Sequence, residues 1–280
     1  MKKISRRGFL AAAGLSVAAL ALTACGGSAS STASSVASSA AASSEAASTS
    51  AAAGELTTVE AGKLTMATNA AFPPYEMTTD AGEFEGIDVE TAQAIADKLG
   101  LELQIDDMDF DAALLSVQQG KADIVMAGVT VTNERKAVMD FSDSYATGIQ
   151  SIIVPEGSDI ASPDDLAGKK IGTQRGTTGY IYCSDDFGDE NVVAYDNGLT
   201  AVQALNNGQV DAVVIDNAPA KEFVAANPGL VILDTSYAEE DYAIGMAKGS
   251  SLEAAINSAL EELKADGTLQ AIVDKYITAE

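Results

Sequence analysis

The 280-residue chain contains no histidine, and this absence removes large classes of enzyme. Without histidine there is neither a histidine-based catalytic triad nor a histidine-ligated metal site. Cysteine is also scarce, because only Cys25 and Cys183 are present, in segments of very different composition. We therefore expect no disulfide framework, and we expect Cys183 to be packed and unreactive. The regular spacing of oxygen ligands that calcium needs is missing too, so the sequence predicts no metal and no cofactor.

Positive charge is the second shortage. The chain has 16 Lys and Arg against 41 Asp and Glu, a formal net charge of −25. Such a surface repels phosphate backbones, so we expect no nucleic-acid partner. We expect the acidic runs 106–107, 185–186 and 239–241 to form solvated surface. The length and the 47% of hydrophobic residues suffice for one large core or two modest ones.

The first 24 residues have the pattern of a signal peptide. A basic head precedes an apolar stretch over 9–22, which is too short to span a bilayer comfortably. Residues 22–25, Leu-Thr-Ala-Cys, resemble the lipobox at which a bacterial signal peptidase cleaves before a lipidated cysteine. We therefore expect a lipid anchor on Cys25. Residues 5–10 also resemble a twin-arginine export motif, and the sequence leaves both export routes open.

A tether follows, assigned to 25–61 together with the lipidated cysteine. Residues 26–53 are almost entirely Ser and Ala with Gly and one Glu, a composition that cannot bury a core. A flexible tether between a lipid anchor and a folded domain indicates that the domain works close to a membrane. We therefore predict an extracytoplasmic protein anchored to the cell membrane.

The remaining chain alternates short β-rich runs with helical stretches. Strands are expected at 64–68, 101–105 and 122–127, and helices at 88–99 and 110–119. This alternation predicts an α/β fold with largely parallel strands.

The alternating pattern occurs twice. Residues 112–130 align without gaps on 200–218, and each stretch contains a helix, a Gly-x-x-Asp turn and a buried strand. The aligned repeat places Gly128 and Asp216 at the same position, just past the third strand of each half. Ligands of open parallel sheets bind outside the carboxyl ends of the strands, so two lobes facing each other would share one ligand. The alternative explanation of the repeat is that any two strand-helix-strand units resemble each other.

Two extended runs without helical period, 145–154 and 242–248, predict that the chain crosses twice between the lobes. The first lobe is then assigned to 62–147 plus 243–280, and the second to 148–242. We expect ligand binding to close the two lobes about the hinge that these runs form.

A second set of motifs lies along the same chain. The loop 128–135 leaves an apolar strand and carries Arg135, which can bind a carboxylate with two hydrogen bonds, although an arginine at the start of a helix can equally face solvent. The segments NAAFPPYE, FEGIDVE, MDFDAALLSVQQG, DAVVIDNAP and GTLQAIVDKY occur in order over 62–280. Together with the loop they strongly resemble solute-binding protein family 3, the bacterial polar amino acid receptors of ABC importers.

The resemblance implies a periplasmic-binding-protein-like fold of type II, with two parallel-sheet lobes joined by a two-strand hinge. It implies a monomer that binds an amino acid between its lobes and delivers it to an ABC permease, without catalysis. Arg135 would bind the α-carboxylate and Asp216 the α-ammonium. The resemblance also implies that Thr130 and backbone amides near Thr177 and Thr178 help to bind the carboxylate, and that Gly128 helps to bind the ammonium.

The side chain of the ligand would meet a different set of residues. Aromatic walls are implied at Phe72, Tyr75 and Phe110, for which plain core packing is the alternative. Asn69 stands where members that bind cationic side chains often have aspartate, which favours a neutral ligand. Gln174 would contact a polar side chain, and Arg175 either does the same or faces solvent.

Two other functions remain open from the sequence alone. An enzyme on the same scaffold, such as a dehydratase, would need Glu76 or Glu85 as its acid, and nothing nearby in the sequence predicts a raised pKa for either. A sensory module that reports to a membrane partner without transport is the other alternative. The sequence does not identify the amino acid, the export route or the permease.

Overall fold

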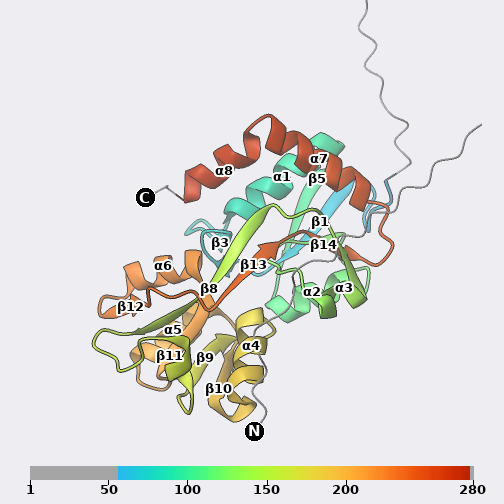
Figure 1. Ribbon diagram of the computed structural model, residues 1–280. Helices are drawn as coiled ribbons and strands as arrows, with labels where there is room; N and C mark the ends of the chain where they lie inside the picture. Colours follow the sequence, from blue (N-terminus) through green and yellow to red (C-terminus); the bar gives the residue numbers. More distant parts are fainter. Residues whose placement is uncertain (1–55, 278–280) are drawn as a thin grey trace, which may run out of the picture. The chain divides into compact units, whose positions relative to one another are not determined.

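The structure is a computed structural model that describes residues 56–277. The predicted signal peptide, Cys25, most of the predicted tether and the last three residues lie outside this range. Strands and helices alternate in the described part and form two large sheets, each in its own lobe (Figure 1). The predicted α/β class is therefore confirmed. No helix of residues 56–277 is long and apolar enough to cross a membrane.

The sheet of the first lobe has the order β5-β1-β6-β14-β7. Strands β5, β1 and β6 are parallel, whereas β14 runs antiparallel to both of its neighbours. The strands are β1 (Lys63–Thr68), β5 (Glu102–Asp107), β6 (Ile124–Val125), β7 (Met139–Phe141) and β14 (Gly245–Ala247), and the helices of this lobe are α1 (Ile87–Leu99), α2 (Phe110–Gln118), α3 (Asn133–Val138), α7 (Glu253–Ala265) and α8 (Thr268–Tyr276). A small sheet, β2 (Ala71–Phe72), β3 (Glu76–Thr78) and β4 (Phe84–Glu85), completes it.

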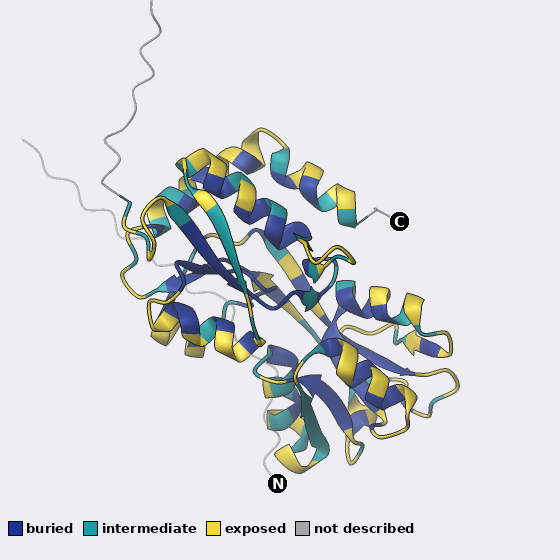
Figure 2. Ribbon diagram, turned by 180° about the vertical axis from the view of Figure 1, so that it is seen from behind, coloured by how far each residue is buried: buried dark blue, intermediate teal, exposed yellow. Residues whose placement is uncertain are grey.

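Strand β1 shows why helices cover both faces of this sheet. Successive side chains of a strand point to opposite faces. Leu64 and Met66 belong to the core cluster that includes buried residues of α1, α7 and α8, whereas Ala67 packs with Phe110 and Val117 of α2. Because both faces are covered, residues 64–68 are all buried, the threonines among them included, and each large apolar side chain contributes about 1.5–3 kcal/mol by its burial. Figure 2 shows the buried strands between helices that expose only their outer faces.

The sheet of the second lobe has the order β10-β9-β11-β8-β12, and β13 also pairs with β8. Strands β9, β10 and β11 are parallel, whereas β8 runs antiparallel to β11, β12 and β13. The elements are β8 (Ala146–Pro155), β9 (Ile171–Gln174), β10 (Val192–Tyr195), β11 (Ala212–Asp216), β12 (Leu230–Ile232), β13 (Ala238–Tyr242), α4 (Thr178–Phe187), α5 (Gly198–Asn206) and α6 (Asn217–Ala226), with short 3-10 helices η1 (Pro163–Leu166) and η2 (Asp189–Asn191).

The chain passes between the two sheets twice, along β8 and along β13 (Figure 1). The two strands pair antiparallel from Ala146 opposite Tyr242 to Gln150 opposite Ala238. The predicted bilobal fold with a two-strand hinge is therefore confirmed. The sheets are mixed and not wholly parallel, because the crossing chain enters each sheet against the direction of its first strands. The lobe boundaries at 147 and 242 stay a prediction.

The sequence repeat corresponds to equivalent structure in the two lobes. Gly120 after α2 and Gly208 after α5 have the same left-handed φ of +66°, a conformation that glycine adopts without steric cost. Asp123 and Asp211 each accept a backbone hydrogen bond from the neighbouring strand segment, at 2.8 and 2.7 Å. Asp123 thus attaches the start of β6 to β1, and Asp211 attaches the start of β11 to the start of β9.

Candidate functional site

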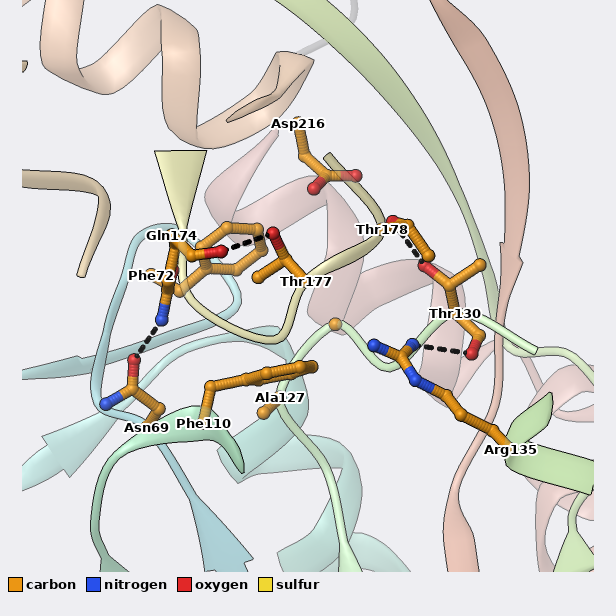
Figure 3. A pocket seen from close by; sticks show the side chains of 11 residues that line it. Asn69, Phe72, Phe110, Ala127, Thr130, Arg135, Gln174, Thr177, Thr178 and Asp216 are labelled. Carbon is orange, nitrogen blue, oxygen red and sulfur yellow. Dashed lines mark hydrogen bonds between the residues drawn. The ribbon is translucent and has the colours of Figure 1, made fainter. Parts of the chain in front are cut away.

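A pocket lies where loops from the carboxyl ends of strands in both lobes meet (Figure 3). The space between its lining atoms is about 300 Å³, including its open mouth. The lining residues are Asn69, Phe72, Phe110, Ala127, Gly128, Thr130, Arg135, Gln174, Thr177, Thr178 and Asp216. Ten of the eleven binding residues expected from the sequence line it, and Ala127 is the addition. Tyr75 does not line it; this residue lines a second cleft together with the hinge residues 147–149 and Tyr242.

Arg135 enters the pocket from the first lobe. Thr132 caps its short helix α3 by accepting a hydrogen bond from the Arg135 backbone N–H. The side chain is buried, with 8% exposed, so it does not face solvent. Its Nη1 donates to the Thr130 carbonyl at 2.8 Å, its Nη2 donates across the lobes to the Gly176 carbonyl at 3.1 Å, and the guanidinium lies 5.3 Å from the centre of the Phe110 ring.

The pKa of Arg135 is lowered chiefly by burial, while nearby acidic groups oppose that shift. Guanidinium remains protonated in proteins even when it is desolvated. The pocket therefore has a fixed cation, held in place by backbone carbonyls and an aromatic ring.

Asp216 enters from the second lobe as the last residue of β11, and only 7% of it is exposed. Its Oδ2 accepts a hydrogen bond from Gln150 Nε2 at 2.8 Å, and its Oδ1 accepts one from the Tyr242 hydroxyl. Burial raises the pKa of Asp216 to about 7, against the lowering effect of the Tyr242 hydrogen bond. A cation placed beside this carboxylate would offset the cost of burying its charge.

The other end of the pocket carries amides and aromatic rings, with no charge. Gln174 Nε2 donates to Asn69 Oδ1 at 2.9 Å, which joins the two lobes, and Asn69 Nδ2 donates to a backbone carbonyl at 2.8 Å. The buried rings of Phe72 and Phe110 lie near these amides (Figure 3). Arg175 is not part of the lining: its side chain is 52% exposed and lies 3.8 Å from Asp196.

The loop at Gly128 is held from behind by a residue that the sequence did not indicate. Gly128 has φ +55°, and a Cβ there would lie 2.9 Å from Phe72 Cε1, so both the conformation and the close approach favour glycine. Its N–H donates to Asp88 Oδ2 at 2.9 Å, and Asp88 Oδ1 accepts the Tyr145 hydroxyl at 2.7 Å. Burial raises the pKa of Asp88 to about 6.

Nothing near Glu76 in the sequence predicts a raised pKa, yet the fold raises it. Glu76 is fully buried, and burial followed by repulsion from Asp88 raises its pKa well above the usual range. The two carboxyls come together only through the fold, because they lie on β3 and α1. Glu76 does not line the pocket, so its raised pKa gives no support to the enzyme alternative.

The threonines of the pocket contact a second residue that the sequence analysis misjudged. Thr178 begins α4, and its Oγ1 lies 3.5 Å from Thr130 Oγ1 of the other lobe. Both hydroxyls donate to Glu240 Oε2, at 2.9 and 3.1 Å. The expectation that 239–241 is solvated was wrong for Glu240, which is 7% exposed. The signal was strand alternation, because Glu240 shares its face of β13 with the fully buried Tyr242.

A pocket between two α/β lobes that are joined by two crossing strands defines a bilobal solute-binding protein. The sequence profile of the bacterial extracellular solute-binding proteins, family 3, matches residues 64–279. The chain belongs to this family, as its motifs had indicated. Since the family consists of solute-binding proteins, the prediction that the chain is not an enzyme is confirmed.

Similar proteins bind amino acids. The L-cystine-binding protein TcyJ of Escherichia coli K12 is 33% identical over 226 residues, covering 79% of this chain and 85% of that protein. The structure of an ancestral arginine-binding protein bound to glutamine is 42% identical, with a TM-score of 0.74 over 78% of this chain and 99% of that one. The arginine-, lysine-, histidine-binding protein ArtJ of Geobacillus stearothermophilus is 34% identical, with a TM-score of 0.75 over 78% and 96%.

Proposed function

We propose that this protein binds one free amino acid between its lobes and delivers it to an ABC importer. One observation carries the proposal: among the residues that line the pocket, Arg135 and Asp216 are the only charged side chains, and they come from different lobes. An α-amino acid presents one carboxylate and one ammonium, so its charges match this pair one to one. Arg135 would bind the carboxylate and Asp216 the ammonium.

The helix α4 supports the carboxylate assignment. Its first turn starts at Thr178, which lines the pocket, and the N–H groups of a first helical turn have no partner within the helix. Such N–H groups and the helix dipole favour an anion. The carboxylate would then lie between Arg135 and the start of α4, so ligand binding would join the lobes.

The ligand we propose is a neutral amino acid. Its side chain would meet Asn69, Gln174, Phe72 and Phe110, which offer amide hydrogen bonds and apolar faces without charge. A buried cationic side chain would have no anionic partner there, which is unfavourable. Calorimetry of the purified domain against all common amino acids tests the proposal. We expect a neutral amino acid to bind more than tenfold more tightly than arginine or lysine, and a failure of every amino acid to bind would overturn the function.

We also propose that the protein is a lipoprotein held at the membrane by Cys25, and that its lobes close on the ligand about the hinge. The sequence of residues 22–25 supports the first proposal, and the two crossing strands support the second. Cys25→Ala should release the protein from the membrane fraction or leave an uncleaved precursor. Small-angle scattering should show compaction with saturating ligand, and an unchanged radius would contradict closure.

A further inference from the structure

A buried carboxylate lies beside the ligand pocket without lining it. Glu240 is on β13, one of the two crossing strands, and only 7% of the residue is exposed. Its strand neighbours Glu239 and Asp241 are exposed. Burial of an acidic side chain is costly unless its oxygens receive hydrogen bonds, so the contacts of Glu240 require an explanation.

Three side chains donate to one oxygen of this carboxylate. Glu240 Oε2 accepts from Thr178 Oγ1 at 2.9 Å, from Gln150 Nε2 at 3.0 Å and from Thr130 Oγ1 at 3.1 Å. Thr130 belongs to the loop after the first-lobe strand β6, and Thr178 begins α4 of the second lobe. One carboxylate on the hinge thus contacts both lobes through residues that line the pocket.

The direction of these hydrogen bonds matters for the ligand. A carboxylate only accepts, and a hydroxyl has a single hydrogen to donate. The hydrogens of both threonine hydroxyls therefore point at Glu240 and away from the pocket. The oxygens of Thr130 and Thr178 keep acceptor lone pairs, so these hydroxyls can accept from an ammonium but cannot donate to a carboxylate.

Gln150 connects this arrangement to Asp216. Its Nε2 donates to Glu240 Oε2 at 3.0 Å and to Asp216 Oδ2 at 2.8 Å. With both hydrogens of the amide used in this way, the two carboxylates are held at fixed positions on either side of Gln150. The region contains these two carboxylates against the single guanidinium of Arg135, a balance that favours a cationic group.

We propose that Glu240 is a positioning residue of the ligand site, which orients the hydroxyls of Thr130 and Thr178 as acceptors for the α-ammonium of the bound amino acid. This inference rests on the proposed function and deepens it, because it assigns the threonine hydroxyls to the ammonium and leaves the carboxylate to Arg135 and backbone N–H groups. Glu240 acts through the two threonines and does not touch the ligand itself.

The test uses a substitution that keeps the shape of the side chain. Glu240→Gln replaces an obligate acceptor with an amide that can donate, so the two hydroxyls are no longer held in one orientation. Glu239→Gln, on the exposed face of the same strand, removes the same charge and is the matched control. By calorimetry with the best amino acid, we expect Glu240→Gln to weaken binding on the order of tenfold. The control should stay within about twofold.

A double-mutant cycle separates positioning from a structural role. If Glu240 acts through Thr130, the fold-loss of affinity caused by Glu240→Gln should be at least about threefold smaller when Thr130→Val is already present. An equal loss in both backgrounds, or a lower unfolding midpoint with unchanged affinity, would overturn the inference. Wild-type protein that binds no amino acid would instead overturn the proposed function, and the inference with it.

Discussion

The two lobes build the same turn from the same repeat, yet they supply opposite halves of the site. At the end of the third strand, the first lobe has Gly128 and the second has Asp216. Gly128 exposes backbone at a left-handed φ and is held by Asp88, whereas Asp216 presents its own carboxylate to the pocket. The cation of the first lobe comes seven residues later, from Arg135. Two similar lobes can thus present opposite charges to one pocket when their equivalent loops differ.

The largest expected loss of ligand affinity follows from substituting Arg135, the cation of the site. Arg135→Ala should weaken all amino acid ligands by thirty-fold to several-thousand-fold, on the order of 2 to 5 kcal/mol, because a buried charge loses its partner. The rank order of ligands should not change, since every amino acid has the same carboxylate. Arg175→Ala is the control, because that arginine is half exposed in the other lobe. Calorimetry that finds near-native affinity in Arg135→Ala would refute the carboxylate assignment.

Asp216, the anion of the site, should make the affinity for the ligand depend on pH. Asp216 faces Gln150, Tyr242 and Glu240, and burial raises its pKa to about 7. Because the ammonium binds the ionised form, protons compete with the ligand below the free pKa, and affinity should rise with pH and level off above about 7. Between pH 5.5 and 7.5 the gain should be on the order of twenty-fold.

The control for this pH dependence is Asp216→Asn. This variant should bind more weakly at neutral pH, and its affinity should be nearly flat over the same range. Titrations at several pH values give both curves. A variant with the same pH profile as the wild type would show that another group is responsible.

A smaller effect, on the choice between ligands, is expected at the uncharged end of the pocket around Asn69. Asn69→Asp should move preference toward arginine and lysine by about tenfold, because a buried carboxylate then meets the ligand's side chain. Asn69→Asp loses the hydrogen bond that Asn69 Nδ2 donates to the Met108 carbonyl, and Asn69→Ser is the control because it loses the same amide donor without added charge. Calorimetry against the amino acid panel measures both variants. Equal shifts in the two variants would exclude a role for charge at this position.

The last expected effect is on the stability of the fold, at two glycines of the repeat. Gly120→Ala should cost about 1 kcal/mol in unfolding free energy, because its φ is +66° but a Cβ would meet nothing within 4 Å. Gly128→Ala should cost about 2 kcal/mol, since its Cβ also approaches the Phe72 ring. Denaturant unfolding measures both. Equal costs would mean that the ring moves aside freely.

The repeat and the order of strands and helices were predictable because they depend on local patterns. Alternation of apolar residues located the strands and helices around the repeat, and the motifs supplied Arg135 and Asp216. Strand alternation would also have located Glu240, but Glu76 and Asp88 were not predictable in the same way. Acidic side chains usually face solvent, and these two are buried by elements far away in the sequence.

Tyr75 shows the same limit for an aromatic residue. The resemblance to the family implied that its ring forms a wall of the pocket. In the structure its ring instead packs edge-on against Tyr242 of the hinge, with 5.2 Å between ring centres. Which side of the loop an aromatic ring occupies depends on the crossing strands, whose packing no local pattern encodes.

In the proposed function, one ligand carries both charges that the two lobes recognise. The most direct measurement is calorimetric titration of the wild-type protein with its best amino acid and with two analogues, one lacking the α-ammonium and one with the α-carboxylate replaced by an amide. Each analogue should bind at least about thirty-fold more weakly than the parent. An analogue that binds as tightly as the parent would contradict the pairing of Arg135 with the carboxylate or of Asp216 with the ammonium.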